Sequence, residues 1–146
     1  MALRWLACLV LMVVGCNGPV GVFPGGRLGG DAAPLPADWS FAGDYGTAQL
    51  ETNPAEPYSV NVAYTILDGG VYVNAGDTET QWVEHIQADP DVRLQIDDAV
   101  YALRAERVED EEVIGRFAEA WISQSMFRRD PRELDGEPYI YRLVAR

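Results

Sequence analysis

Apolar and polar residues alternate over most of the chain beyond Trp39, with the period of two that is typical of β-strands. The clearest case is Tyr58–Leu67, where one face carries Tyr58, Val60, Val62, Tyr64 and Ile66. The other face carries Ser59, Asn61, Ala63 and Thr65. Asp68-Gly69-Gly70 can supply the positive φ angles of a tight turn, so we expect a hairpin into a strand over residues 71–75.

The same pattern predicts four further strands, over residues 47–52, 92–97, 99–108 and 138–144. The second and third of these form another hairpin, which turns at Asp97-Asp98.

A helical period interrupts the strands first at residues 79–88. Thr78 and Gln81 have capping-box spacing at its start, and Asp89-Pro90 ends it because proline disfavours helical geometry in the residue before it. We expect Trp82, Ile86 and His85 on its inner face.

A second helix is expected over residues 111–125, with Asp110 as its N-cap. One apolar stripe contains Val113, Ile114, Phe117, Ala118, Trp121 and Ile122. The acidic run at residues 109–112 meets the positive end of the helix dipole, which explains it without a metal or a partner. The order of three strands, a helix, two strands, a helix and a strand predicts an α+β domain.

Three stretches carry a resemblance to a known family. Residues 71–76 (Val-Tyr-Val-Asn-Ala-Gly) are followed by Trp82 on a helix and then by residues 88–94 (Ala-Asp-Pro-Asp-Val-Arg-Leu). This arrangement resembles the split β-barrel proteins related to pyridoxamine 5′-phosphate oxidase and to the deazaflavin-dependent nitroreductases, as does the closing segment 141–146. The resemblance implies a mainly antiparallel, six-stranded split β-barrel with two helices over residues 38–146.

The resemblance also implies where a cofactor would lie. Five residues correspond to the cofactor-binding region of the relatives: Tyr64, Asn74, Gly76, Thr78 and Trp82. Flavin mononucleotide (FMN) or a deazaflavin would be the cofactor, bound at the interface of a homodimer. The alternative is that these side chains only fill the barrel.

The segments that hold the cofactor phosphate in those families contain no base in this chain. They correspond to residues 76–81 and 53–57, where Asp77, Glu79 and Glu56 would repel a phosphate. Each such pair costs about 1 kcal/mol at 4 Å in water and about 4 kcal/mol near a protein surface. We therefore expect no bound cofactor.

Other candidate sites each have a simpler explanation. His85, beside Glu84, could act as an acid or base, but a lone helical histidine is more often a packing residue. Arg128, Arg129 and Arg132 form the only basic cluster, which suggests either an anion site or pairing with neighbouring acids. The sequence contains no nucleophile elbow, zinc-protease or phosphate-loop motif, so we assign no catalytic or metal-binding residue.

The N-terminus has the pattern of a bacterial lipoprotein signal. Arg4 precedes nine apolar residues, 6–14, too few to span a bilayer, and Val13-Val14-Gly15-Cys16 matches a lipobox. We expect residues 1–15 to be removed and Cys16 to carry acyl chains such as palmitate. Cys8 leaves with the signal, so disulfides and cysteine nucleophiles are excluded in the mature chain.

Residues 16–37 are expected to form a tether behind this anchor. Residues 17–37 hold six glycines and four prolines, which allows an extended reach of up to about 3.1 Å per residue and places the domain some tens of Å from the bilayer. Asn17 is not the aspartate that retains lipoproteins in the inner membrane of enteric bacteria. In a Gram-negative host we therefore expect the outer membrane, with the domain facing the periplasm.

Charge limits the partners. The formal charge of −12 becomes −13 when Arg4 is removed, which argues against nucleic acid and against anionic lipid headgroups. Export of an unfolded chain also prevents loading of a flavin in the cytoplasm. The sequence thus favours an envelope lipoprotein whose barrel is non-catalytic or binds a ligand; the alternative is an exported flavin- or deazaflavin-dependent oxidoreductase.

Overall fold

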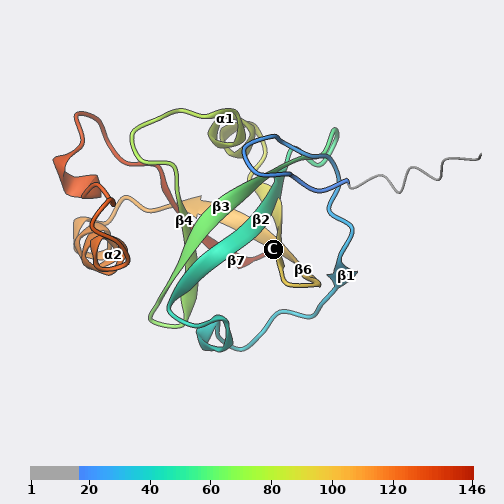
Figure 1. Ribbon diagram of the computed structural model, residues 1–146, viewed down its shortest axis with the longest axis horizontal. Helices are drawn as coiled ribbons and strands as arrows, with labels where there is room; N and C mark the ends of the chain where they lie inside the picture. The colour runs from blue at the N-terminus through green and yellow to red at the C-terminus, as the bar shows by residue number, and fades with distance from the viewer. Residues whose placement is uncertain (1–16) are drawn as a thin grey trace, which may run out of the picture.

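Six antiparallel strands close into a barrel in the computed structural model, which describes residues 17–146 (Figure 1). The strands are β2 (Tyr45–Thr52), β3 (Tyr58–Leu67), β4 (Gly70–Asn74), β5 (Asp91–Ile96), β6 (Ala99–Arg107) and β7 (Ile140–Ala145). They neighbour one another in the order β6-β5-β2-β3-β4-β7, and pairing of β7 with β6 closes the barrel. The lipobox and Cys16 lie outside the described residues.

Helices α1 (Gln81–Ala88) and α2 (Glu111–Ser123), with the short 3-10 helices η1 (Ser40–Ala42) and η2 (Pro131–Glu133), complete the domain. The predicted fold class, an α+β six-stranded antiparallel barrel with two helices, is confirmed.

A seventh strand, β1 (Asp31–Ala32), was not expected. It runs parallel to β6 and pairs with Ala99 and Val100, whereas β7 pairs with the later part of the same edge, from Leu103 to Arg107. The strands β1 and β7 therefore share one edge of β6.

Both predicted hairpins form. Asp68 and Gly69 adopt positive φ angles of 50° and 72° between β3 and β4, as a two-residue turn requires. Asp97 adopts a φ of 53° in the turn between β5 and β6.

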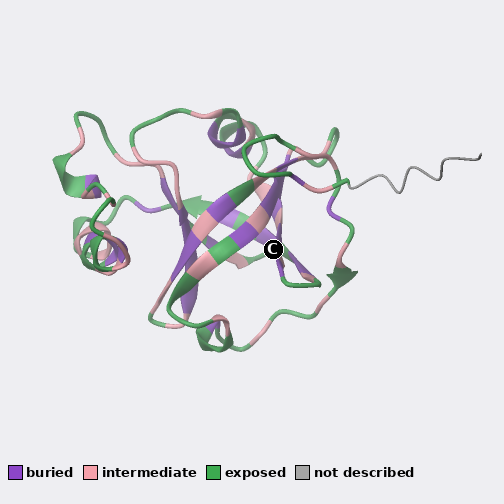
Figure 2. Cartoon of the chain, in the orientation of Figure 1, coloured by how far each residue is buried: buried purple, intermediate pink, exposed green. Residues whose placement is uncertain are grey.

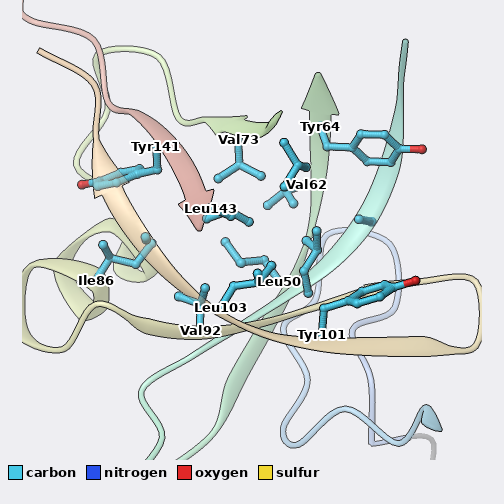
Figure 3. Packing of buried hydrophobic residues seen from close by; sticks show 14 of the residues in the cluster. Leu50, Val62, Tyr64, Val73, Ile86, Val92, Tyr101, Leu103, Tyr141 and Leu143 are labelled. Carbon is cyan, nitrogen blue, oxygen red and sulfur yellow. The ribbon is translucent and has the colours of Figure 1, made fainter. Parts of the chain in front are cut away.

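The alternation in β3 sorts its side chains as expected. Val62 and Tyr64 are buried in the barrel interior, and Tyr58, Val60 and Ile66 pack against the same core. Figure 3 shows the interior, where Leu50, Val73 and Leu143 point inward from different strands. Trp82, Val83 and Ile86 of α1 join this cluster, so α1 covers one end of the barrel.

Helix α2 packs on the outside of the barrel through a second cluster. Phe117 and Trp121 stack with ring centroids 5.9 Å apart and lie against Tyr72 of β4 and Ile140 of β7. The buried residues of α2 are Phe117, Ala118 and Trp121, and much of the rest of the helix is exposed or intermediate (Figure 2). Ile122, which the sequence placed on the stripe, is 37% exposed because it lies at the margin of the contact.

The two helices begin differently. Asp110 caps α2 by accepting hydrogen bonds from the backbone N–H groups of Glu112 and Val113, as predicted. The capping box of Thr78 and Gln81 is wrong: the N-cap of α1 is Thr80, whose side chain makes no cap hydrogen bond. The chain is still turning at Thr78, where its carbonyl accepts from the N–H of Thr80, so the helix starts later.

The glycine-rich segment that was expected to be a tether lies largely against the barrel. Gly25 exchanges two backbone hydrogen bonds with Ser59 of β3, and Ala33 donates to the carbonyl of Val100. Leu28 is buried, and its N–H donates to the carboxylate of Glu51 over 2.6 Å. These contacts shorten the free chain between Cys16 and the domain to almost nothing.

Candidate ligand-binding cleft

A cleft of about 450 Å³ opens between the barrel wall and the segment that follows α2. Four of the five predicted cofactor-binding residues line it, namely Asn74, Gly76, Thr78 and Trp82. Its volume lies in the range of pockets that hold small ligands, about 300–1,000 Å³. The structure thus brings the loop after β4 into a space of the right size for a small molecule.

The loop after β4 is held by its own backbone. The Asn74 side chain accepts a hydrogen bond from the N–H of Gly76 over 2.8 Å, and Gly76 adopts a φ of 65°. Gly76 and Ala75 also exchange backbone hydrogen bonds with Tyr139. This leaves the amide nitrogen of Asn74 as the donor that the side chain can offer to a ligand.

Tyr64, the fifth predicted residue, lies outside the cleft. It is buried in the barrel, and its hydroxyl donates to the carbonyl of Ala42 over 2.8 Å. Its ring lies so close to Gly46 that a Cβ there would come within 2.6 Å of the Tyr64 hydroxyl oxygen. Burial raises the pKa of Tyr64. Tyr64 therefore fills the barrel, the alternative that the sequence left open.

The basic cluster divides into two parts. Arg132 pairs with Asp130 over 2.6 Å and lies 3.9 Å from Glu119. Arg128 and Arg129 line the cleft instead, together with the residues of the β4 loop, and the Arg128 guanidinium lies 3.8 Å from the ring centroid of Trp121. Within residues 17–146, neither of these two arginines is within 4 Å of a carboxylate oxygen.

The sequence predicts an anion site as one alternative for Arg128, Arg129 and Arg132, but it does not place these residues beside the cofactor region, because the family holds the phosphate with two other segments. The structure supplies bases from the loop after α2, some fifty residues further along the chain than Thr78. Trp121 on the apolar stripe, seven residues before Arg128, was a usable signal, since arginine often stacks on tryptophan.

The charges in the cleft are mixed. Asp77 also lines it and disfavours an anion, but the two guanidinium groups outnumber this single carboxylate. Two tryptophans, Trp82 and Trp121, add aromatic surface. The arrangement therefore suits a ligand that combines a flat ring with a negatively charged group.

His85 is not in the cleft. Its Nδ1 lies 2.9 Å from the hydroxyl oxygen of buried Thr52, and its ring meets the Tyr58 ring edge-on at 5.0 Å. These contacts hold α1 on the barrel. Among the described residues, no group of three metal-ligating side chains occurs, and no helix is long and apolar enough to cross a membrane.

The architecture is that of the split β-barrel proteins. The chain is similar to a conserved hypothetical protein from Mycobacterium tuberculosis, with 21% identity and a TM-score of 0.55 over 68% of this chain and 72% of that one. It is also similar to a pyridoxamine 5′-phosphate oxidase-like protein from Listeria innocua, with 18% identity and a TM-score of 0.53 over 67% of this chain and 82% of that one. Identities this low show a shared fold.

No protein-family model matches the chain, and no curated protein sequence matches it.

Proposed function

We propose that the protein is a lipid-anchored protein of the cell envelope whose barrel domain binds a small phosphate-bearing ligand in the cleft. The observation that carries this proposal is that Arg128 and Arg129 line the same cleft as the loop that holds Asn74, Gly76 and Thr78. Planar guanidinium groups bind phosphate through paired hydrogen bonds. A half-buried arginine that stacks on Trp121, with an exposed arginine next to it in the chain, thus makes an anion site beside an aromatic surface.

FMN fits this arrangement. Arg128 and Arg129 would hold its phosphate, and Trp82 would contact its ring. When bound, a flavin supplies two-electron redox chemistry. The expectation of no bound cofactor came from loops that lack bases and carry acids, and the two arginines supply the missing bases because they line the same cleft from another part of the chain.

The anchor is supported by the sequence of the signal. Val13-Val14-Gly15-Cys16 ends an apolar segment too short to span a membrane. Two or three acyl chains on Cys16 would hold the protein firmly, at about 0.8 kcal/mol per buried methylene. In a Gram-negative host, the domain would face the periplasm from the outer membrane.

A flavin- or deazaflavin-dependent oxidoreductase is the second candidate, favoured by the likeness to the pyridoxamine 5′-phosphate oxidase-like fold. It requires a bound flavin that a reductant can reduce and an oxidised substrate can reoxidise. This candidate also predicts a homodimer, because the resemblance implies a cofactor bound at the interface between two subunits. Anaerobic reduction of the flavin-loaded protein, followed by its absorbance, separates this candidate from a binding protein.

The binding proposal is tested by titrating the mature protein with FMN, with riboflavin, which lacks the phosphate, and with pyridoxal 5′-phosphate, which lacks the flavin ring. We expect FMN to bind more tightly than riboflavin. Arg129→Gln should weaken FMN binding about tenfold or more, the effect of losing a hydrogen bond to a charged group.

Arg132→Gln is the matched control, because Arg132 belongs to the same cluster but pairs with Asp130. It should leave FMN affinity unchanged. Equal affinity for FMN and riboflavin, or equal losses in the two variants, would contradict a phosphate site at Arg128 and Arg129. Absence of a thermal shift with any of the three compounds would reject the proposal.

A further inference from the structure

The first described residues form a short loop with an apolar tip. In this N-terminal loop (residues 17–26), Val20 and Phe23 exchange two backbone hydrogen bonds, and Gly21 turns the chain with a φ of 59°. The tip side chains point away from the protein: Val20 is 61% exposed, Val22 92% and Phe23 72%. Three exposed apolar residues within four positions form a patch, unlike the single ones that are common on surfaces.

The loop is fixed to the barrel. The N–H of Gly26 donates to the carbonyl of Asn17 over 2.7 Å, and the Asn61 side chain of β3 donates to the carbonyl of Gly21 over 3.0 Å. Gly25 pairs with Ser59 and lies so close to Gly18 that a Cβ on Gly25 would come within 2.3 Å of the Gly18 backbone. Figure 1 shows the loop in blue, lying across the barrel.

The first described residue, Asn17, lies only three residues before the tip residue Val20. Consecutive Cα atoms lie about 3.8 Å apart, and three residues span at most about 11 Å, which limits the distance from Asn17 to Val20. Acyl chains on Cys16 would therefore enter the bilayer close to the tip. The apolar side chains of the tip could then insert at the boundary of headgroups and acyl chains, where amphipathic segments reach a depth of about 5–10 Å.

The charge of the loop also suits a lipid surface. Residues 17–26 contain no charged side chain, in a chain with 23 acidic residues. The barrel residues that meet the loop through hydrogen bonds or close contact, Gln49, Ser59 and Asn61, are neutral too. Residues 17–26 can thus approach lipid headgroups without bringing a carboxylate of their own near them.

We propose that the N-terminal loop seats the domain directly on the lipid bilayer, with Val20, Val22 and Phe23 inserted among the lipids beside the anchor. This proposal rests on the proposed lipidation of Cys16. The sequence predicts a domain held some tens of Å from the bilayer on a free tether. Under this proposal the domain instead lies on the bilayer, and its own fold fixes its orientation.

The test uses the full chain, expressed in a host that processes lipoproteins, with a single engineered thiol at Val22→Cys. Cys8 leaves with the signal and lipid occupies Cys16, so a thiol-reactive fluorophore labels only position 22. The labelled protein is reconstituted into phosphatidylcholine vesicles with and without a phosphatidylcholine that carries a spin label near its headgroup. Glu112→Cys, on the exposed start of α2, is the matched control.

We expect blue-shifted emission at position 22 and loss of most of that emission in spin-labelled vesicles, with no quenching at position 112. Replacing Val20 and Phe23 by serine should reduce the quenching. Unquenched emission at position 22 would contradict insertion of the loop into the bilayer. This holds both for a loop exposed to water and for a loop covered by another protein.

Mass spectrometry of the same preparation separates the two proposals. Acyl chains on Cys16 together with an unquenched label would leave the anchor standing and refute the seating alone. A mature chain without acyl chains would refute the anchor, and the seating with it.

Discussion

Two segments cover the outer wall of the barrel, and they use different interactions. Helix α2 covers it with side chains, since Phe117 is fully buried and Trp121 nearly so. The N-terminal segment, residues 17–33, covers it with its backbone, through Gly25 on Ser59 and Leu28 on Glu51. A segment without an apolar stripe can therefore be as well placed as an amphipathic helix when the barrel offers it unpaired polar groups.

The buried group at the centre of the second contact is a carboxylate. Glu51 is 5% exposed, and it accepts hydrogen bonds from the N–H of Leu28 and from the guanidinium of Arg93, its cross-strand neighbour on β5. Both oxygens of Glu51 are within 3.2 Å of the Arg93 Nη1. The N-terminal segment is thus fastened to an ion pair that the barrel already contains.

The comparison predicts the largest loss of stability for α2. Phe117→Ala removes a fully buried ring and should lower the free energy of unfolding by about 3–5 kcal/mol. Guanidinium denaturation measures this loss. Ile122→Ala, at the exposed margin of the same helix, should change it by about 0.5 kcal/mol or less; equal losses would show that α2 does not stabilise the barrel through its buried face.

Glu51→Gln tests the other cover. Glutamine keeps an acceptor for the N–H of Leu28 but loses the charge that Arg93 faces, so we expect a loss of about 1.5–3 kcal/mol. Amide exchange at Leu28 should become faster, because its hydrogen bond weakens. Unchanged exchange together with unchanged stability would show that the carboxylate does not hold the segment.

Gly25→Ala separates the backbone contact from the ion pair. The new Cβ would meet the Gly18 backbone, so the loop must move and lose its bonds to Ser59, at about 1–2 kcal/mol. Limited proteolysis should then cut the N-terminal loop more rapidly. Gly29→Ala is the control, since a Cβ at Gly29 meets nothing within 4 Å; equal rates of cleavage in both variants would contradict the role of close approach.

The smallest effect is expected at an exposed ion pair of the same chemistry. The side-chain hydrogen bond from Arg132, with that from its backbone N–H, lowers the pKa of the Asp130 carboxyl. A carboxyl whose pKa is lower in the folded than in the unfolded state stabilises the fold at pH values above the unfolded pKa of about 3.9. This stabilisation is lost as the pH falls through the folded pKa. Because Arg132 is exposed and Glu51 is buried, Asp130→Asn should lower the free energy of unfolding at pH 7 less than Glu51→Gln does.

Denaturation at pH 7 and in steps below pH 4 checks this, because the difference between Asp130→Asn and the parent should shrink as Asp130 becomes protonated. A difference that persists at the lowest pH would assign Asp130 another role.

The same contrast explains what the sequence could predict. The sequence predicts the apolar stripe of α2, the alternation in β3 and the turn at Asp68-Gly69, because each depends on residue types at regular or fixed spacing. The composition of the N-terminal segment predicts a tether, because the contacts that hold the segment use backbone groups and one isolated leucine, Leu28. Backbone partners leave no period in a sequence.

The cleft was predicted in part. Asn74, Gly76, Thr78 and Trp82 are close in sequence, and the resemblance to split barrels located them together. Arg128 and Arg129 could not be placed, since only the packing of α2 on β4 and β7 brings the loop after α2 to the β4 loop. A contact over such a separation depends on the tertiary fold.

The side chain of Asn61 has a consequence for communication within the molecule. It lines the cleft, and it also holds the carbonyl of Gly21 in the N-terminal loop. A ligand that took the Asn61 amide for itself would weaken the hydrogen bond to the loop, and by linkage a change in loop position that altered Asn61 would change the affinity for that ligand by the same factor. Under the two proposals, one amide would then couple occupancy of the cleft to the orientation of the domain on the membrane.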